Sequence, residues 1–330
     1  MRRAAPILLL LALVLPLAAC GEDTLTVYSG RNEDLVGPLI QRFEDETGIE
    51  TEVRYAGSAE LAATLLEEGE ETPADVFFSQ DAGALGALQE RRMLADLPGP
   101  VLGRVAPRFR SAADDWVGTS GRVRVIAFDT REVRTGELPP SVLGLTNARF
   151  RGRVGWAPTN ASFQTFVTAL RLTQGEDVAR RWLEDMQAND VQAYENNIAI
   201  RDAIANGEIA LGLINHYYVG QAIAEEGADY PVGLYTPRGD VGGLVNVAGA
   251  GVLADSDRAE DAQRFVSFLL QPAAQRYFAQ ETREYPLIPG VPARQPGLPP
   301  LERIDGPEVD LNRLSDLQGT VELLQGTGVL

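Results

Sequence analysis

The sequence Leu25-Thr26-Val27-Tyr28-Ser29-Gly30-Arg31-Asn32 opens a regular alternation of apolar runs and amphipathic segments. Its first four residues have the composition of a buried strand, and a polar loop follows them. Residues 34–47 then carry apolar side chains at helical spacing, and Gly48 ends the pattern. One strand followed by one helix predicts the start of an α/β fold.

The alternation continues along the N-terminal part of the chain. Strands are predicted at 50–55 and 75–78, and helices at 58–68 and 82–89. Strands that alternate with helices form a mostly parallel sheet with helices on both faces. A second α/β segment starts after residues 122–129, a long strand-like run that is suited to crossing between two lobes.

The length of 330 residues exceeds what one hydrophobic core comfortably holds, so we predict two lobes. Residues 25–124 plus 240–330 are assigned to lobe 1, and residues 125–239 to lobe 2. The segment 235–243, rich in Gly and Pro, is expected to carry the return crossing. In open α/β sheets ligands bind beyond the carboxyl ends of strands, which places the expected site in the cleft between the lobes.

The N-terminus has the pattern of an export signal. Two arginines precede an apolar stretch at 7–15, which is shorter than the roughly 20 residues that a spanning helix needs. Leu17-Ala18-Ala19-Cys20 resembles the bacterial lipobox. We therefore expect residues 1–19 to be a lipoprotein signal peptide, Cys20 to be lipidated, and residues 20–24 to tether the protein to the outer face of the cell membrane or within the periplasm. The alternative is an ordinary signal peptide with a chance cysteine.

The composition excludes several classes of function. The chain has 29 basic residues, all of them arginine, against 47 acidic ones, so a nucleic acid is not an expected partner. Without lysine there is no Schiff-base chemistry and no phosphate-loop lysine. One histidine and one cysteine argue against Ser-His, Cys-His and His-rich zinc sites. No enzyme is predicted; a lipid-anchored hydrolase is the alternative from another class, although no Gly-x-Ser-x-Gly elbow is present.

The apolar run 209–214 leads into Asn215-His216-Tyr217-Tyr218. Neighbouring side chains point to opposite faces of a strand and lie roughly 100° apart on a helix, so two adjacent phenols meet one ligand only where an element ends. Phenolate oxygens are hard donors that suit a small trivalent cation. The alternative is that both rings simply pack there. Asn215 is expected to cap the next element, and His216 to face away from the ligand.

Several segments occur in the order found in one known family. These segments are Leu25–Asn32, Thr72–Phe78, Ser120–Arg122, Ile214–Tyr218 and Glu284–Leu287. With them the chain resembles the bacterial ferric-ion-binding proteins, which are the receptors of iron(III) ABC importers. The resemblance implies the type II periplasmic-binding-protein fold, with two lobes and two crossover hinge strands. It also implies a cleft that closes around a metal ion.

The resemblance further implies a set of site residues. Tyr217 and Tyr218 match the paired iron ligands of the family. Asn32 falls where several members have a ligand histidine, and Gln80 falls where some have a ligand glutamate. A synergistic anion, carbonate or phosphate, is also expected. The residues that match the family's anion loop and its supports are Asn160, Ala161, Ser162, Asn197 and Asn215. Arg31 and Arg122 are further candidates for binding this anion.

The predicted function is therefore an extracytoplasmic receptor that delivers Fe³⁺ to an ABC permease and its ATPase, with a monomer as the expected state. Because the histidine and glutamate ligands of the family are missing, a second possibility stays open. In that alternative the chain is an importer receptor for another small ligand, such as a phosphonate, a polyamine or a thiamine-like compound.

Overall fold

The computed structural model describes residues 24–293 and 295–330. The predicted signal peptide and Cys20 lie outside the described residues, and only Thr24 of the predicted tether lies within them. In the part of the chain that is described, no helix has the length and apolar character needed to cross a membrane.

The N-terminal half of the sheet has parallel strands with helices between them. Its elements are β1 (Leu25–Ser29), α1 (Glu33–Thr47), β2 (Thr51–Tyr55), α2 (Ser58–Glu68), β3 (Val76–Ser79) and α3 (Ala82–Glu90). Strand β1 pairs in parallel with both β2 and β3. Asn32 caps α1 by accepting a hydrogen bond from the Asp34 N–H, and Gly48 ends the helix at φ 71°. The predicted alternation of strands and helices is therefore present here.

The second lobe repeats this arrangement of strands and helices. Its elements are β5 (Val154–Trp156), α5 (Ala161–Gln174), α6 (Glu176–Ala188), β6 (Gln192–Ala193), α7 (Asn197–Ala205), β7 (Leu211–Asn215), α8 (Tyr217–Glu226) and β8 (Val232–Tyr235). Strand β5 pairs in parallel with β6 and β7. Edge-to-face contacts among Trp156, Phe163, Phe166 and Trp182 fill the space between the sheet and α5 and α6.

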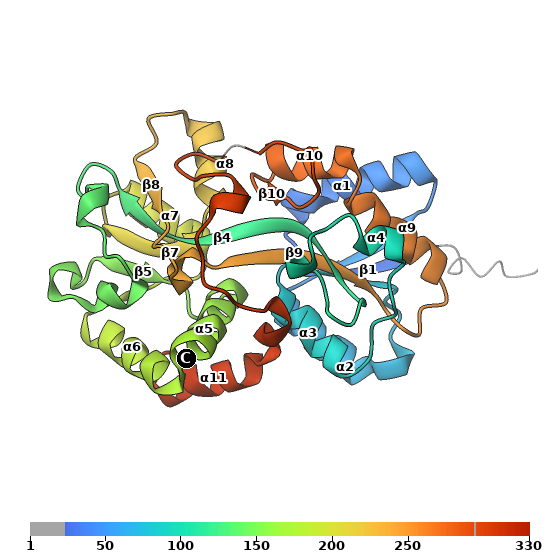
Figure 1. The fold of residues 1–330 in the computed structure, drawn as a ribbon, viewed down its shortest axis with the longest axis horizontal. Coiled ribbons are helices and arrows are strands. Elements are labelled where there is room, and N and C mark those ends of the chain that lie inside the picture. The colour runs from blue at the N-terminus through green and yellow to red at the C-terminus, as the bar shows by residue number, and fades with distance from the viewer. Residues whose placement is uncertain (1–23, 294) are drawn as a thin grey trace, which may run out of the picture.

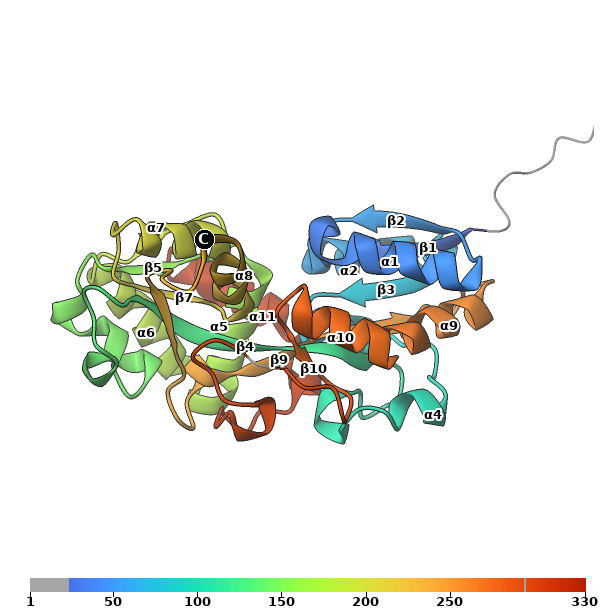
Figure 2. The same ribbon diagram turned by 90° about the horizontal axis from the view of Figure 1, so that it is seen from above.

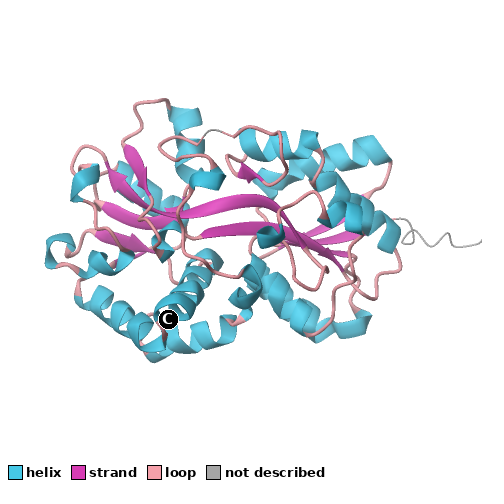
Figure 3. Cartoon of the chain, viewed as in Figure 1, coloured by secondary structure: helices cyan, strands magenta, loops and turns pink. Residues whose placement is uncertain are grey.

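Two long antiparallel strands connect the lobes, β4 (Val117–Asp129) and β9 (Val245–Val252) (Figure 1). The first part of β4 pairs with β9, and its second part pairs with β7 and β8. The sheet order is β2-β1-β3-β9-β4-β7-β5-β6, so one sheet continues through both lobes while helices cover its outside (Figures 2 and 3). The predicted α/β architecture with two crossover strands is confirmed.

The C-terminal part of the chain returns along both lobes. Its elements are α9 (Ala259–Leu269), α10 (Pro272–Gln280), β10 (Tyr285–Pro286) and α11 (Leu317–Gly326). A further short helix, α4 (Gly99–Leu102), precedes β4 in the chain. Helix α11 contacts α5, where the Thr168 and Thr320 hydroxyls are 2.7 Å apart. The turn 311–315 packs on α3: a Cβ at Gly83 would lie 2.6 Å from the Leu314 carbonyl oxygen. The lobe boundaries stay a prediction. Helix α11 lies in the range predicted as lobe 1 but contacts α5, which lies in the range predicted as lobe 2.

Some elements differ from the sequence-based expectation. Strand β4 begins at Val117 rather than at 122. The sequence analysis missed this part of the strand because Gly118 and Ser120 give no strand pattern, although both are buried. Helices α7, α8 and α10 were not predicted. The expected capping by Asn215 is wrong: Asn215 is the last residue of β7, and His216 occupies the N-cap position of α8 without a side-chain hydrogen bond.

Candidate metal-binding site

Tyr217 and Tyr218 lie at the junction of β7 and α8 and are the first two residues of that helix. Their ring centroids are 4.2 Å apart, with 36° between the ring planes. Tyr217 is 1 % exposed, whereas Tyr218 is half-buried and lines a cavity. The two phenols therefore approach each other at the end of an element, as two ligands of one ion would have to.

The surroundings keep Tyr218 in its neutral form. Burial raises the pKa of Tyr218 well above its ordinary value, and the neighbouring Tyr217 raises it further. Arg31 and Arg122 act in the opposite direction because they are positively charged. A bound cation would supply the additional charge that a phenolate needs here.

Two cavities are lined by residues of both lobes, and Tyr218 lines one of them. One, of about 400 Å³, is lined by Asn32 and Tyr218, together with the carboxylates of Asp34, Glu225 and Glu281. The other, of about 420 Å³, has a different set of walls: Gly30, Ser58, Gln80, Asn160, Ala161 and Glu195. The structure therefore brings Asn32 to the cavity of Tyr218 and places Gln80 beside the predicted anion loop.

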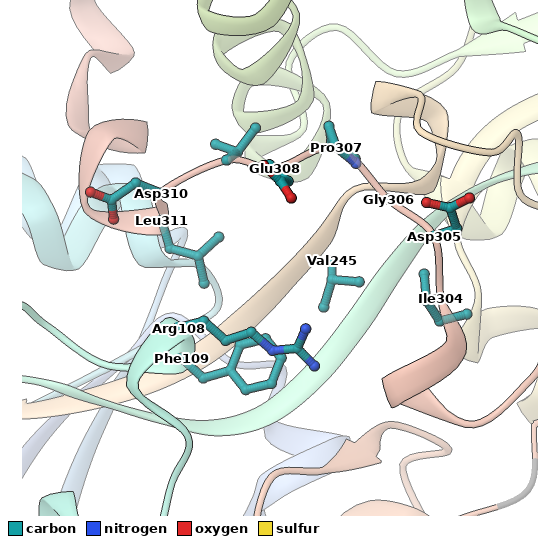
Figure 4. A pocket seen from close by; sticks show the side chains of 11 residues that line it. Arg108, Phe109, Val245, Ile304, Asp305, Gly306, Pro307, Glu308, Asp310 and Leu311 are labelled. Carbon is teal, nitrogen blue, oxygen red and sulfur yellow. The ribbon is translucent and has the colours of Figure 1, made fainter.

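A third cavity, of about 570 Å³, lies behind the crossing strands between Val245 and the segment 304–311 (Figure 4). Arg108, stacked on Phe109, faces the carboxylate-rich segment there. None of the predicted site residues lines this cavity.

The predicted anion loop forms the start of α5. Asn160 caps this helix, and its Oδ1 accepts hydrogen bonds from the Ser162 N–H at 3.0 Å and from the Ser162 hydroxyl at 2.6 Å. Ala161 is the first residue of the helix. Asn197 begins α7 and Asn215 ends β7, and both are buried. Asn197 Nδ2 makes only a long contact of 3.5 Å to Ser162 Oγ. The Asn215 Nδ2 has no hydrogen-bond partner within the described residues.

The two candidate arginines have different surroundings. Arg31 forms a buried bidentate ion pair with Glu284, with nitrogen–oxygen distances of 3.0 and 2.6 Å. Arg122 is 1 % exposed, and within residues 24–293 and 295–330 neither of its terminal nitrogens has a hydrogen-bond partner. Burial lowers the pKa of Arg122, while the Asp81 carboxylate and then Tyr217 act to raise it. Arg122 is thus a buried cation with two free N–H-bearing nitrogens.

Arg124, two residues further along β4, is a site residue that the sequence analysis missed. It is 3 % exposed, and its guanidinium bonds to Leu213 O at 2.6 Å, Ser162 Oγ at 3.2 Å and Asn197 Oδ1 at 3.3 Å. Burial and then the neighbouring Arg122 lower the pKa of Arg124 to about 9. The signal that could have revealed it is Arg122-Val123-Arg124, because residues two apart on a strand share one face.

His216 faces the crossing strand, in agreement with the expectation that it points away. It is 0 % exposed, and its Nδ1 accepts a hydrogen bond from the Val123 N–H at 3.1 Å. The ring stacks on Tyr285 with 5.0 Å between centroids. Burial lowers the pKa of His216 to about 3, so the imidazole is neutral at physiological pH. Among the described residues, no group of three or more His, Cys, Asp or Glu side chains could hold a metal ion.

Comparison with known proteins gives a consistent family. A family model described as "Bacterial extracellular solute-binding protein" matches residues 71–308. The Major ferric iron-binding protein of Neisseria meningitidis serogroup B is 32% identical over 326 residues, which is 97% of either chain.

Solved structures agree with this result. Iron-bound HitA from Pseudomonas aeruginosa has a TM-score of 0.87 and 32% identity, and the match covers 92% of this chain and 99% of that one. A Trichodesmium protein in complex with iron and citrate has a TM-score of 0.79 and 26% identity over 92% of this chain and 99% of that one. The two-lobed periplasmic-binding-protein fold implied by the resemblance is confirmed.

Proposed function

The chain belongs to the family of bacterial extracellular solute-binding proteins, and from this premise we propose that it captures ferric iron for an ABC importer. Support comes from the Neisseria relative named as a ferric iron-binding protein and from the iron-bound Pseudomonas structure. Iron is the cargo, held between the lobes and then released to a permease. The family consists of transport receptors, and the proposal includes no catalytic step.

The observation that carries this proposal is the close phenol pair at the start of α8, with ring centroids 4.2 Å apart. Tyr217 and Tyr218 offer two hard oxygen donors from one helical turn, beside a cavity that both lobes line. The ion's own charge would drive the loss of the phenolic protons, because a coordinated cation lowers the pKa of a bound acid.

A synergistic anion would complete the ligand set in this proposal. Asn32 and Gln80 carry neutral amides where other members have charged or imidazole ligands, so they would contribute weakly. The two free terminal nitrogens of Arg122 are suited to a bidentate oxyanion such as carbonate or phosphate. The start of α5 would add the backbone N–H of Ala161 to the same anion, because the N–H groups of Asn160 and Ser162 already donate to Ala157 O at 3.1 Å and Asn160 Oδ1 at 3.0 Å. Arg31 contributes less, because Glu284 already occupies its guanidinium.

The proposal includes the location of the receptor. Lipidation of Cys20 would hold the protein on the outer face of the membrane, close to the permease that takes up the iron with its ATPase. The protein is expected to act as a monomer. A phosphonate would suit Arg122 but would leave the phenol pair unused, and a polyamine or thiamine-like cation would be repelled by the buried arginines. Ferric iron with an anion uses both features.

The test is the double substitution Tyr217→Phe plus Tyr218→Phe in the full chain. We expect loss of the phenolate-to-iron absorption band and a drop in iron affinity of about a thousandfold or more. The matched control is Tyr277→Phe, which removes a phenol from the opposite wall of the same cavity, where its hydroxyl donates to Leu35 O at 2.9 Å. If the double variant kept the band and the affinity of the unmodified chain, the proposed function would be wrong.

A further inference from the structure

We propose that Arg124 is a positioning residue that orients the Asn197 amide of lobe 2 as a hydrogen-bond donor for the anion. This inference rests on the proposed function and concerns the same site. It assigns a role to a side chain that the sequence pattern did not single out.

The first step concerns what Arg124 can offer its neighbours. A guanidinium has only donors, so every group that contacts it must present an acceptor. Its Nη1 reaches Ser162 Oγ at 3.2 Å and Asn197 Oδ1 at 3.3 Å, and its Nη2 reaches Leu213 O at 2.6 Å. These three acceptors belong to α5, α7 and β7, so one side chain connects the elements that carry the predicted anion residues.

The second step follows from the geometry of a carboxamide. Because Arg124 holds the oxygen of Asn197, the Nδ2 group must point away from the guanidinium, and it makes only a long contact of 3.5 Å to Ser162 Oγ. Ser162 accepts from Arg124, and its own proton goes to Asn160 Oδ1 at 2.6 Å. The Ser162 hydroxyl is therefore used within the cluster, and the Asn197 amide, whose oxygen is occupied and whose Nδ2 makes a long contact, is the group that can donate to a ligand.

The third step concerns charge. Within the described residues Arg124 has no carboxylate at ion-pair distance, and its hydrogen-bond partners Ser162 Oγ, Asn197 Oδ1 and Leu213 O are neutral oxygens. Arg122 lies two residues away on the same strand, and no described residue hydrogen-bonds to its terminal nitrogens. Two buried positive charges so close together favour an anion over a second cation as the ligand. The same arrangement orients the amide and attracts the ligand.

The experiment measures how much anion the chain needs to load iron. In the full chain, Arg124→Met should need about tenfold more carbonate or phosphate for half-maximal development of the iron band, because one charged donor and the fixed amide are lost. Arg124→Lys, which keeps a charged donor, should restore part of the loss. The position of the band should also respond less to exchange of carbonate for phosphate in Arg124→Met than in the unmodified chain.

Two further variants make the test decisive. Arg171→Met is the control, because Arg171 on α5 also donates to a hydroxyl, that of Thr320 at 2.9 Å, outside this cluster. Asn197→Asp keeps the oxygen that Arg124 holds and removes the amide donor, and it should show the same increased anion requirement even if Arg124→Met does not fold.

An unchanged anion requirement in both Arg124→Met and Asn197→Asp would overturn the inference, and so would a loss of loading that is equal at every anion concentration. A different result concerns the proposed function: if the unmodified chain develops no iron band with any anion, that function fails first, and this inference fails with it.

Discussion

Arg31 and Arg122 are both buried at the crossing between the lobes, but of the two only Arg31 forms an ion pair within the described residues. Glu284 binds Arg31 through two contacts, at 3.0 and 2.6 Å. Arg122 has no partner for its terminal nitrogens among the described residues, and burial lowers its pKa. A paired buried cation is part of the folded framework, whereas an unpaired one costs stability unless a ligand neutralises it. The difference separates the structural arginine from the binding one, which residue type alone cannot do.

His216 is a third solution to the same problem. This basic side chain is also fully buried beside the crossing strand, but it avoids the cost by staying neutral. Of these three basic side chains, Arg31 is thus paired with a carboxylate, Arg122 is left for a ligand, and His216 is deprotonated. Each arrangement predicts a different response to substitution or to pH.

The largest effect is expected when the balanced arginine loses its partner. Glu284→Gln leaves Arg31 buried with an uncompensated charge, so we expect the free energy of unfolding to fall by about 3–5 kcal/mol. Urea denaturation of the iron-free chain measures this. Glu281→Gln is the control, because Glu281 is exposed and lies three residues earlier. A change in Glu284→Gln no larger than in Glu281→Gln would show that the pair contributes little and would remove the contrast with Arg122.

A smaller, pH-dependent effect is expected from His216. Its pKa is lowered from 6.5 to about 3 in the folded chain, so below pH 6.5 the unfolded chain takes up a proton that the folded chain does not. Stability is therefore lost as the pH falls, by roughly 2 kcal/mol between pH 7 and pH 5.

His216→Asn should flatten this part of the stability profile, since asparagine does not titrate. Urea midpoints of both iron-free chains across this pH range provide the measurement. Parallel profiles for the two chains would mean that the imidazole is protonated in the folded state.

The smallest change in stability is expected for Arg122, and it should be opposite in sign to the change in iron binding. Arg122→Met replaces an unpaired buried charge with an apolar side chain, so the iron-free chain should gain about 1 kcal/mol or stay unchanged. Iron loading at a fixed anion concentration should fall about tenfold. Thermal unfolding and iron titration of the same preparation measure the two quantities. A loss of stability comparable to that of Glu284→Gln would show that Arg122 is structural as well.

The sequence was most informative where the determining residues are neighbours. The strand–helix alternation and the phenol pair depend on local spacing, and both could be predicted. Arg124 was missed because its partners Ser162, Asn197 and Leu213 lie 38, 73 and 89 residues away. The role of Arg31 stayed open for the same reason, since Glu284 is 253 residues distant.

The missed elements have a physical explanation as well. Helix α8 buries Tyr217, Val219, Gly220 and Ala222, and small residues of this kind give a weak amphipathic signal. The start of β4 contains two glycines and is buried on both faces, so it lacks the alternation that marks a half-exposed strand. In both places the packing of distant segments determines the structure.

The C-terminal segment has a practical consequence. The turn 311–315 packs on α3, and α11 contacts α5 through Thr320 and through the ion pair of Asp316 with Arg171 at 2.9 Å. Helices α3 and α5 begin beside the ligand-facing loops, with Asp81 and Asn160 as their N-cap residues. In a fluorescent sensor built from this protein, reporter dyes should therefore be attached at exposed positions away from α11. A bulky fusion at α11 would disturb its contact with α5 and so the loops whose movement the sensor should report.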